Sequence, residues 1–414
     1  MAHELPYGQP DPLTLRFGDE LRVIECQVPR GKPVDDVEQA VRAALESPMD
    51  FPPLTRSVVT GDRVVIPVAE GIPQTPRVVA AVVKTLVDGG TAPSDITLLT
   101  AAKSKGETNS EGKSTSPLVS RLPEAWRDQV EVVLHDPDEP NIMAYLAASK
   151  AGDPLYVHRI LSDADMVIPI GALRVPAAKS LHSNFDSLFP IFSDRETQKR
   201  YRVQDEKEWK TLAKLRRDDA NEVGWWLGVQ FTVQVIPGPD DSILQVLAGH
   251  CDPVFDHGRE IARAAWRVEV PEPVSMVVAS VAGGTDQQTW ESFSRALNAA
   301  SKLVSDHGVI VLCTSLRSKP GPALRKLIDW SVGDPLPSSL RRDRTPDALA
   351  ALALADARQH ARVYLMSRMD SDTVEDLGIG FVSQGDEIEH LAKKQDACLL
   401  LPNAQHAEVV VCDA

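Results

Sequence analysis

The sequence predicts an α/β protein made of two α/β domains, each with a mostly parallel sheet, and an interdomain cleft. Two observations support this fold class. Short apolar runs rich in β-branched residues alternate with amphipathic stretches of helical length, and strands joined through helices in this way are parallel neighbours. The alternation breaks at a proline-containing segment near residues 267–275, which is typical of a domain boundary.

The first series of elements begins with RVVIPVA (63–69), a continuous apolar run of strand length. TPRVVAAVVKTLVDGG (75–90) is expected to be a helix, because Thr75 is a candidate N-cap, Pro76 suits the first helical position and two glycines follow. The strands expected next are DITLLTA (95–101), EVVLHD (131–136) and DMVIPIGA (165–172). Ligands bind to such sheets at the carboxyl ends of the strands.

A second series follows the proline-containing segment. Its expected elements are a strand over 275–284, a helix over 288–304, a strand over 307–315 and one long helix over 346–367. Two more apolar runs lie in ACLLLPNAQHAEVVVCDA at the end of the chain. We therefore expect an N-terminal α/β domain over 1–270, a smaller C-terminal α/β domain over 271–405, and a tail over 406–414 that could return to the N-terminal domain.

Composition narrows the classes of partner and of metal site. The 414 residues carry a formal net charge of −15 with no basic block, so we expect no nucleic-acid partner. No window approaches the roughly 18 uninterrupted apolar residues of a membrane helix, so we expect a cytoplasmic protein without a membrane partner. The five cysteines are scattered, and GHCDPVFDHG (249–258) has no spacing typical of a closed metal site, so no metal site is predicted.

Cationic side chains follow two of the predicted strands. Because neighbouring strand ends meet at one edge of a parallel sheet, these side chains should converge with the carboxylate that follows the first strand. The residues are Glu70, Lys103, Lys105, Arg174, Lys179 and His182. A cluster of cations against the net charge of the chain predicts a small anionic ligand, either a carboxylate or a phosphate.

Several segments, taken together, resemble a known family. They are Tyr7-Gly8, the strand–helix–strand over 63–101, VVLHD (132–136), GDPLYVHRILSDADMVIPIG (152–171) and the double glycine followed by Asp-Gln and an aromatic residue (283–290). In order and spacing they resemble the lactate racemase family, whose members are two-domain racemases and epimerases of 2-hydroxy acids. The resemblance implies a nickel-pincer nucleotide held by a lysine and a histidine, and two further histidines that act as bases.

Matched position by position, the chain departs from the family at most of these residues. Glu70 stands at the family's aspartate, but Pro73 replaces the arginine that follows it, and Ser104 replaces the first histidine. An alignment without gaps puts Pro176 at the second histidine and Asp186 at the lysine.

A gapped alignment would instead put Lys179 at the lysine. No histidine lies near 199–202, where the nickel ligand would fall. In the second domain, Glu291 and Ser294 stand where the family has glutamine and lysine. The nickel-pincer nucleotide is therefore not expected to be retained.

Two functions remain open from the sequence. The first is an isomerase-type enzyme for 2-hydroxy acids with altered or lost activity, with His182 and Glu70 as catalytic candidates. Its substrate-binding candidates are Lys103, Lys105, Arg174 and Lys179. The second is a non-catalytic module that binds a small anion on the same scaffold.

Overall fold

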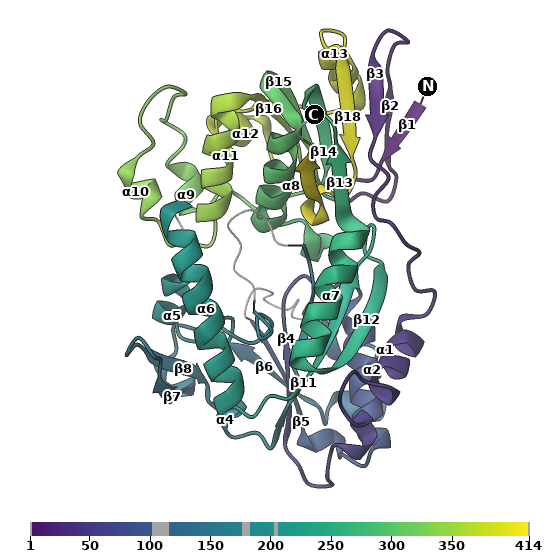
Figure 1. Cartoon of the computed structure of the whole chain (residues 1–414), viewed down its shortest axis with the longest axis vertical. Coiled ribbons are helices and arrows are strands. Elements are labelled where there is room, and N and C mark those ends of the chain that lie inside the picture. The colour runs from purple at the N-terminus through teal and green to yellow at the C-terminus, as the bar shows by residue number, and fades with distance from the viewer. Residues whose placement is uncertain (1, 102–115, 176–182, 203–205, 413–414) are drawn as a thin grey trace, which may run out of the picture.

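The structure is a computed structural model that describes residues 2–101, 116–175, 183–202 and 206–412 (Figure 1). It confirms the predicted fold class: two mostly parallel sheets, each covered by helices. No helix in these ranges is long and apolar enough to cross a membrane. Lys103, Lys105, Lys179 and His182 lie outside the described residues.

The first sheet has the strand order β12-β11-β10-β4-β5-β6, with β9 beside β4. Its strands are β4 (Val64–Val68), β5 (Ile96–Ala101), β6 (Glu131–His135), β9 (Met166–Val167), β10 (Ile170–Ala172), β11 (Phe231–Pro237) and β12 (Ile243–His250). All neighbours are parallel except β11 and β12. Every residue of β4 is buried, as expected for a central strand with both faces covered.

Helices cover both faces of this sheet. They are α1 (Val37–Glu46), α2 (Thr75–Asp88), α3 (Glu124–Arg127), α4 (Arg159–Ser162), α5 (Arg195–Arg200), α6 (Glu206–Trp226) and α7 (Cys251–Trp266). Side chains of α1 and α2 pack with one face in a single core cluster, and side chains of α6 pack in another. The α2 helix begins one residue earlier than expected, because Gln74 (φ 50°) is its N-cap and Thr75 is already helical.

The second sheet has the order β17-β16-β15-β14-β18-β3, with every pair parallel. Its strands are β3 (Arg22–Glu25), β14 (Val274–Ser280), β15 (Val304–Cys313), β16 (Arg362–Met366), β17 (Gly380–Phe381) and β18 (Ala397–Leu401). The helices of this part are α8 (Trp290–Leu303), α9 (Pro322–Arg325), α10 (Ser338–Arg341), α11 (Ala348–His360), α12 (Ser371–Asp376) and α13 (Gly385–Ala392). The remaining strands form three small pairs: β1 (Ala2–Leu5) with β2 (Leu13–Arg16), β7 (Met143–Ala148) with β8 (Pro154–His158), and β13 (Arg267–Val270) with β19 (Glu408–Val411).

The structure differs from the expected elements at two places. The long helix expected over 346–367 is wrong, because α11 ends at His360 and RVYLM forms β16; an alternating, partly β-branched run suits a strand better than a helix. Strand β3 pairs with β18 in the second sheet, although the sequence analysis assigns residues 1–270 to the first domain. Nothing in the local pattern of RVIE indicates a partner so distant in the chain.

Candidate functional site

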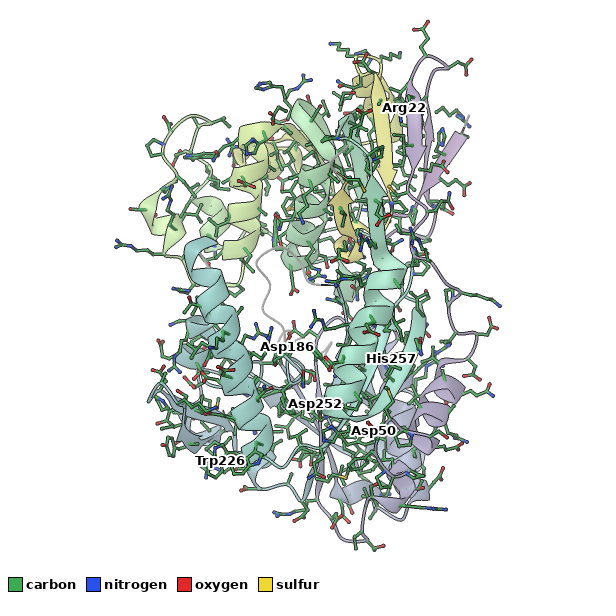
Figure 2. All side chains as sticks on the ribbon, viewed as in Figure 1. Arg22, Asp50, Asp186, Trp226, Asp252 and His257 are labelled. Atoms are coloured by element: carbon green, nitrogen blue, oxygen red, sulfur yellow. The ribbon has the colours of Figure 1, made fainter. Side chains whose placement is uncertain are left out.

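A cavity of about 520 Å³ opens where the strands of the first sheet end. Strand-end residues form its base, and α5, α6, α7 and the start of α8 contribute its walls. Pro346 and Leu349, which lie at the start of α11, complete the lining. In Figure 2, Asp186 lies between α6 and α7, on the side of the first sheet that faces the second. The cavity therefore has walls from both halves of the chain.

Two of the predicted site residues, Glu70 and Arg174, line this cavity. Glu70 follows β4 and Arg174 follows β10, so both are strand-end residues as predicted. The other four, Lys103, Lys105, Lys179 and His182, lie in the undescribed ranges. Their roles stay predictions.

Arg174 links the two halves of the chain. Its Nη2 donates to the main-chain oxygen of Gly71 and, at 3.4 Å, to Oε1 of Gln287. The Nε2 of Gln287 donates to the same Gly71 oxygen at 2.9 Å. Because Gln287 precedes α8, this triangle fixes the start of α8 against the end of β4.

Arg295 on α8 makes a second link. Its Nε donates to the Gln405 oxygen at 2.8 Å, and its Nη2 donates to the Val175 oxygen at 2.7 Å. Burial, and to a smaller extent the neighbouring charge of Arg174, lower the pKa of Arg295 to about 10, although Glu291 opposes the change. The same two arginines, together with burial, hold the pKa of His406 well below its usual value. This wall thus carries positive charge that carbonyl oxygens do not neutralise.

The opposite wall, on α5 and α6, is also rich in arginine. Arg216 forms an ion pair with Asp186, with 3.1 Å between Nη2 and Oδ1, and Ser183 donates to the same carboxylate oxygen at 3.3 Å. The Nη1 of Arg202 donates to the Arg344 oxygen at 2.6 Å. Burial and the charge of Arg195 lower the pKa of Arg202.

Guanidinium groups outnumber carboxylates around the cavity. Among the described lining residues, the cations are Arg174, Arg195, Arg202, Arg216, Arg259 and Arg295, and the carboxylates are Glu70, Asp186 and Glu291. Arg259 lies over the ring of Phe255, with 5.4 Å to its centroid. In a chain with a net charge of −15, this local excess makes the cavity attractive to anions.

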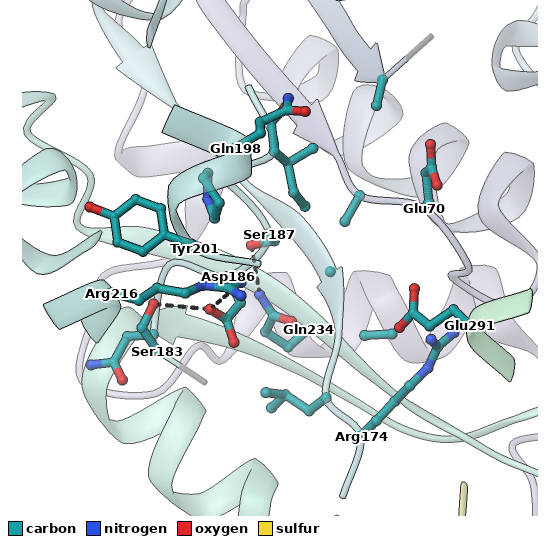
Figure 3. Close-up of a pocket in the computed structure, with 18 of the residues that line it drawn as sticks. Glu70, Arg174, Ser183, Asp186, Ser187, Gln198, Tyr201, Arg216, Gln234 and Glu291 are labelled. Carbon is teal, nitrogen blue, oxygen red and sulfur yellow. Dashed lines mark hydrogen bonds and ion pairs between the residues drawn. The ribbon is translucent and has the colours of Figure 1, made fainter. Parts of the chain in front are cut away.

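Uncharged polar side chains lie at the base between the two walls (Figure 3). The Nε2 of Gln234 donates to Thr232 Oγ1 at 2.8 Å and to Ser187 Oγ at 3.3 Å. Gln234 is 5% exposed and stands in β11, where every residue is buried. It faces Gly171, where an added Cβ would lie 2.6 Å from Gln234 Oε1. The missing side chain at Gly171 therefore leaves the space that the polar Gln234 side chain occupies.

Burial and hydrogen bonds hold three other side chains of the lining in one protonation state. Burial raises the pKa of the Cys251 thiol to about 12, so it stays protonated at neutral pH. The Tyr201 hydroxyl donates to the buried Asp219 carboxylate, and burial with this bond raises the pKa of the phenol. His135 lies 3.0 Å from the Ser193 oxygen through Nε2. Because a carbonyl oxygen only accepts, that nitrogen carries the proton, and burial lowers the pKa of the ring.

Sequence reasoning missed five of the six arginines. Arg195 and Arg216 lie on polar helices, and such residues are usually solvated. Arg259 and Arg295 belong to amphipathic helices whose orientation is set only by tertiary packing. Gln234 had a usable signal, because it is the only amide in the otherwise apolar run FTVQVIP.

The described lining does not fit the nickel-pincer nucleotide that the family resemblance implies. It contains no lysine, and Asp186 uses its carboxylate to bind Arg216. No three His, Cys, Asp or Glu side chains in the described ranges form a set that could hold a metal ion. We derive no chemical step through that cofactor. The alternative anchor, Lys179, lies outside these ranges.

Comparison with known proteins shows which proteins the chain resembles. Residues 7–177 match the lactate racemase N-terminal domain. The fold matches the lactate racemase apoprotein from Thermoanaerobacterium thermosaccharolyticum with a TM-score of 0.76 and 16% identity, over 99% of this chain and 100% of that one.

A protein from Thermotoga maritima matches with a TM-score of 0.65 and 13% identity, over 92% of this chain and 100% of that one. At these identities the likeness shows the fold alone. No curated protein sequence matches the chain. Residues 7–177 thus resemble the lactate racemase N-terminal domain, and the chain as a whole has the fold of the lactate racemase apoprotein.

Proposed function

We propose that the cavity binds a small organic anion, a carboxylate or a phosphate, on the lactate racemase scaffold. The observation that carries this proposal is the excess of guanidinium groups, six against three carboxylates, among the described residues that line one cavity. Guanidinium forks match the two oxygens of a carboxylate or phosphate. A volume of about 520 Å³ also lies within the range of small-molecule sites.

Arg259 offers the cleanest test of this proposal. Its guanidinium stacks on Phe255 and makes no hydrogen bond or ion pair within the described part of the chain. Its replacement therefore removes charge from the cavity without breaking a polar contact. Arg263, one turn further along α7, instead pairs with Glu408 at 3.0 Å and does not line the cavity.

The experiment is calorimetric titration of the full chain with lactate, butyrate and inorganic phosphate, with neutral lactamide as the control ligand. We expect the anions to bind, lactamide not to bind, and the affinity to fall as salt rises. Arg259→Gln should weaken anion binding by roughly 3- to 10-fold, which corresponds to about 1 kcal/mol. Arg263→Gln should bind like the unchanged protein. The proposal is wrong if no anion binds at about 10 mM, or if the two variants are weakened equally.

Isomerisation of a 2-hydroxy acid is the second candidate function, favoured by the position of Glu70. Figure 3 shows this carboxylate on the cavity wall, on the same side as Arg174 and Glu291. A carboxylate near a bound substrate can serve as a general base. The test is the interconversion of D- and L-lactate. Activity lost in Glu70→Gln with lactate affinity retained would support a base, whereas no interconversion by the unchanged protein removes lactate isomerisation.

A further inference from the structure

The positive charge of the cavity is divided between two opposite walls. We call one side the α8 wall, which consists of Arg174, Arg295 and Glu291. We call the other side, built by α5 and α6, the α6 wall; it consists of Arg195, Arg202 and Arg216, with Asp138 paired to Arg195 and Asp186 paired to Arg216. Figure 3 shows Arg174 and Glu291 on one side of the cavity and Arg216 and Asp186 on the other. Ser187 and Gln234 lie between the two sides.

Each wall has a guanidinium group whose hydrogen bonds to the described residues go to neutral carbonyl oxygens: Arg295 on the α8 wall and Arg202 on the α6 wall. On the α8 wall, two guanidinium groups face Glu291. Burial lowers the pKa of both Arg174 and Arg295, and the charge of Glu291 opposes this change; Glu70 lies on the same side of the cavity. On the α6 wall, Arg195 binds Asp138 through two bonds of 2.9 and 2.7 Å and is also affected by the charge of Asp136, and Arg216 binds Asp186.

Each wall also has guanidinium N–H groups that make no hydrogen bond to the described residues. Arg295 uses Nε and Nη2 on carbonyl oxygens, and its Nη1 makes no hydrogen bond to the described residues. Arg202 uses Nη1 on the Arg344 oxygen, which leaves Nε and Nη2 without a hydrogen bond in the same ranges. Neutral carbonyl partners orient these guanidinium groups without cancelling their charge.

We propose that the natural ligand is a dianion, with one anionic group on each wall and its linking atoms over Ser187 and Gln234. The inference rests on the proposed function and narrows its ligand class. A monoanion can reach only one of Arg202 and Arg295 and leaves the other with neutral carbonyl partners in a partly enclosed space. A dicarboxylate and a phosphorylated carboxylic acid share the required chemistry.

The test compares chain-matched ligands by calorimetry of the full chain. Succinate and adipate are set against butyrate and hexanoate, and phosphoglycolate represents the phosphorylated acids. We expect a dianion to bind roughly tenfold or more tightly than its matched monoanion, with one ligand per chain. Comparison of the affinities for the dicarboxylates and for phosphoglycolate shows which of the two ligand classes the cavity prefers.

Arg202 and Arg344 each donate a hydrogen bond to the main-chain oxygen of the other. Variants of these two residues test whether Arg202 holds the second anionic group. Arg202→Gln should lower dianion affinity by clearly more than it lowers monoanion affinity, so that most of the dianion preference is lost. Arg202→Lys, which keeps the charge, should keep part of the preference. Arg344→Gln is the matched control, because Arg344 does not line the cavity. It should keep the full preference, and thermal melts will show that each variant is folded.

The outcomes separate the two proposals. Equal affinity for matched monoanions and dianions, two monoanions bound per chain, or equal loss of preference in Arg202→Gln and Arg344→Gln would overturn the dianion inference while anion binding stands. If neither class of anion binds, the proposed function itself is wrong, and the inference falls with it.

Discussion

Arg202 and Arg344 each donate a guanidinium hydrogen bond to the main-chain oxygen of the other. The two residues are 142 positions apart; Arg202 follows α5 beside the first sheet, and Arg344 precedes α11 in the second half of the chain. Two like charges are thus held together by carbonyl acceptors alone. This reciprocal contact joins the two halves of the chain beside the cavity.

The first prediction concerns the stability that this contact supplies. Arg344→Ala should lower the free energy of unfolding by about 1–2 kcal/mol, because one charged donor is lost and the Arg202 oxygen loses its partner. Chemical denaturation measures the change. Arg342→Ala, at an exposed neighbouring position, should stay within about 0.5 kcal/mol. Equal effects of the two variants would show that the reciprocal contact adds nothing.

A second prediction concerns pH. Burial lowers the pKa of His158 from 6.5 to about 4, with a further contribution from His135, whose ring centroid lies 5.6 Å away. The unfolded chain takes up this proton near pH 6.5, but the folded chain does so only near pH 4. The stability contributed by the neutral ring is therefore complete above pH 6.5 and is lost as the pH falls toward 4.

The matching variant is His158→Asn. The Nδ1 of His158 accepts from the Ile160 N–H at the start of α4, and asparagine can also act as an N-cap. The variant should keep this contact and flatten the fall of unfolding free energy between pH 6.5 and 4. His257→Gln, at an exposed position on α7, should leave the pH profile unchanged. An unaltered slope in His158→Asn would contradict the assignment.

The third prediction concerns the base of the cavity. At Gly171, an added Cβ would meet Ser187 Cβ at 2.8 Å as well as Gln234 Oε1. Gly171→Ala should therefore lower the free energy of unfolding by about 1–3 kcal/mol, the usual cost of overpacking a core. Gly18→Ala meets nothing within 4 Å and should be near neutral. Thermal melts of both variants provide the measurement, and similar melting temperatures would disprove the crowding.

A fourth prediction addresses the buried pair beside the cavity. Tyr201 and Asp219 are 3% and 1% exposed, and the phenol is the hydrogen-bond donor to the carboxylate. Tyr201→Phe should cost about 1–3 kcal/mol of unfolding free energy at neutral pH, since a buried carboxylate loses its donor. Tyr145→Phe, at a tyrosine that is 58% exposed, is the control. Adding Asp219→Asn should recover part of the loss, and a strictly additive double variant would count against the pairing.

The features that could be predicted from the sequence are those set by residues that are close together in the chain. The apolar runs at Val64–Val68 and Ile96–Ala101 form strands as predicted, because a fully buried strand has a distinctive composition. The ends of β4 and β10 predicted Glu70 and Arg174, and both residues lie on the cavity wall. Nothing local showed that Arg202 and Arg295 would line the same cavity, since their meeting depends on how distant elements pack. The arginine-rich character of the site was therefore missed, and its lysine candidates remain untested.

The pairing of β3 with β18 constrains how the protein is made. The ribosome releases β3 long before its partner β18, because most of the described residues lie between the two strands. Until then β3 has an unpaired edge, which nascent chains must keep from aggregating. A fragment that ends at residue 270 would keep this orphan strand, and a fragment that begins there would expose the edge of β18. The first half should therefore be expressed without β3 and the second half with β3 attached so that it can pair with β18, and a circular permutant that begins after β3 would bring β3 and β18 into the same half.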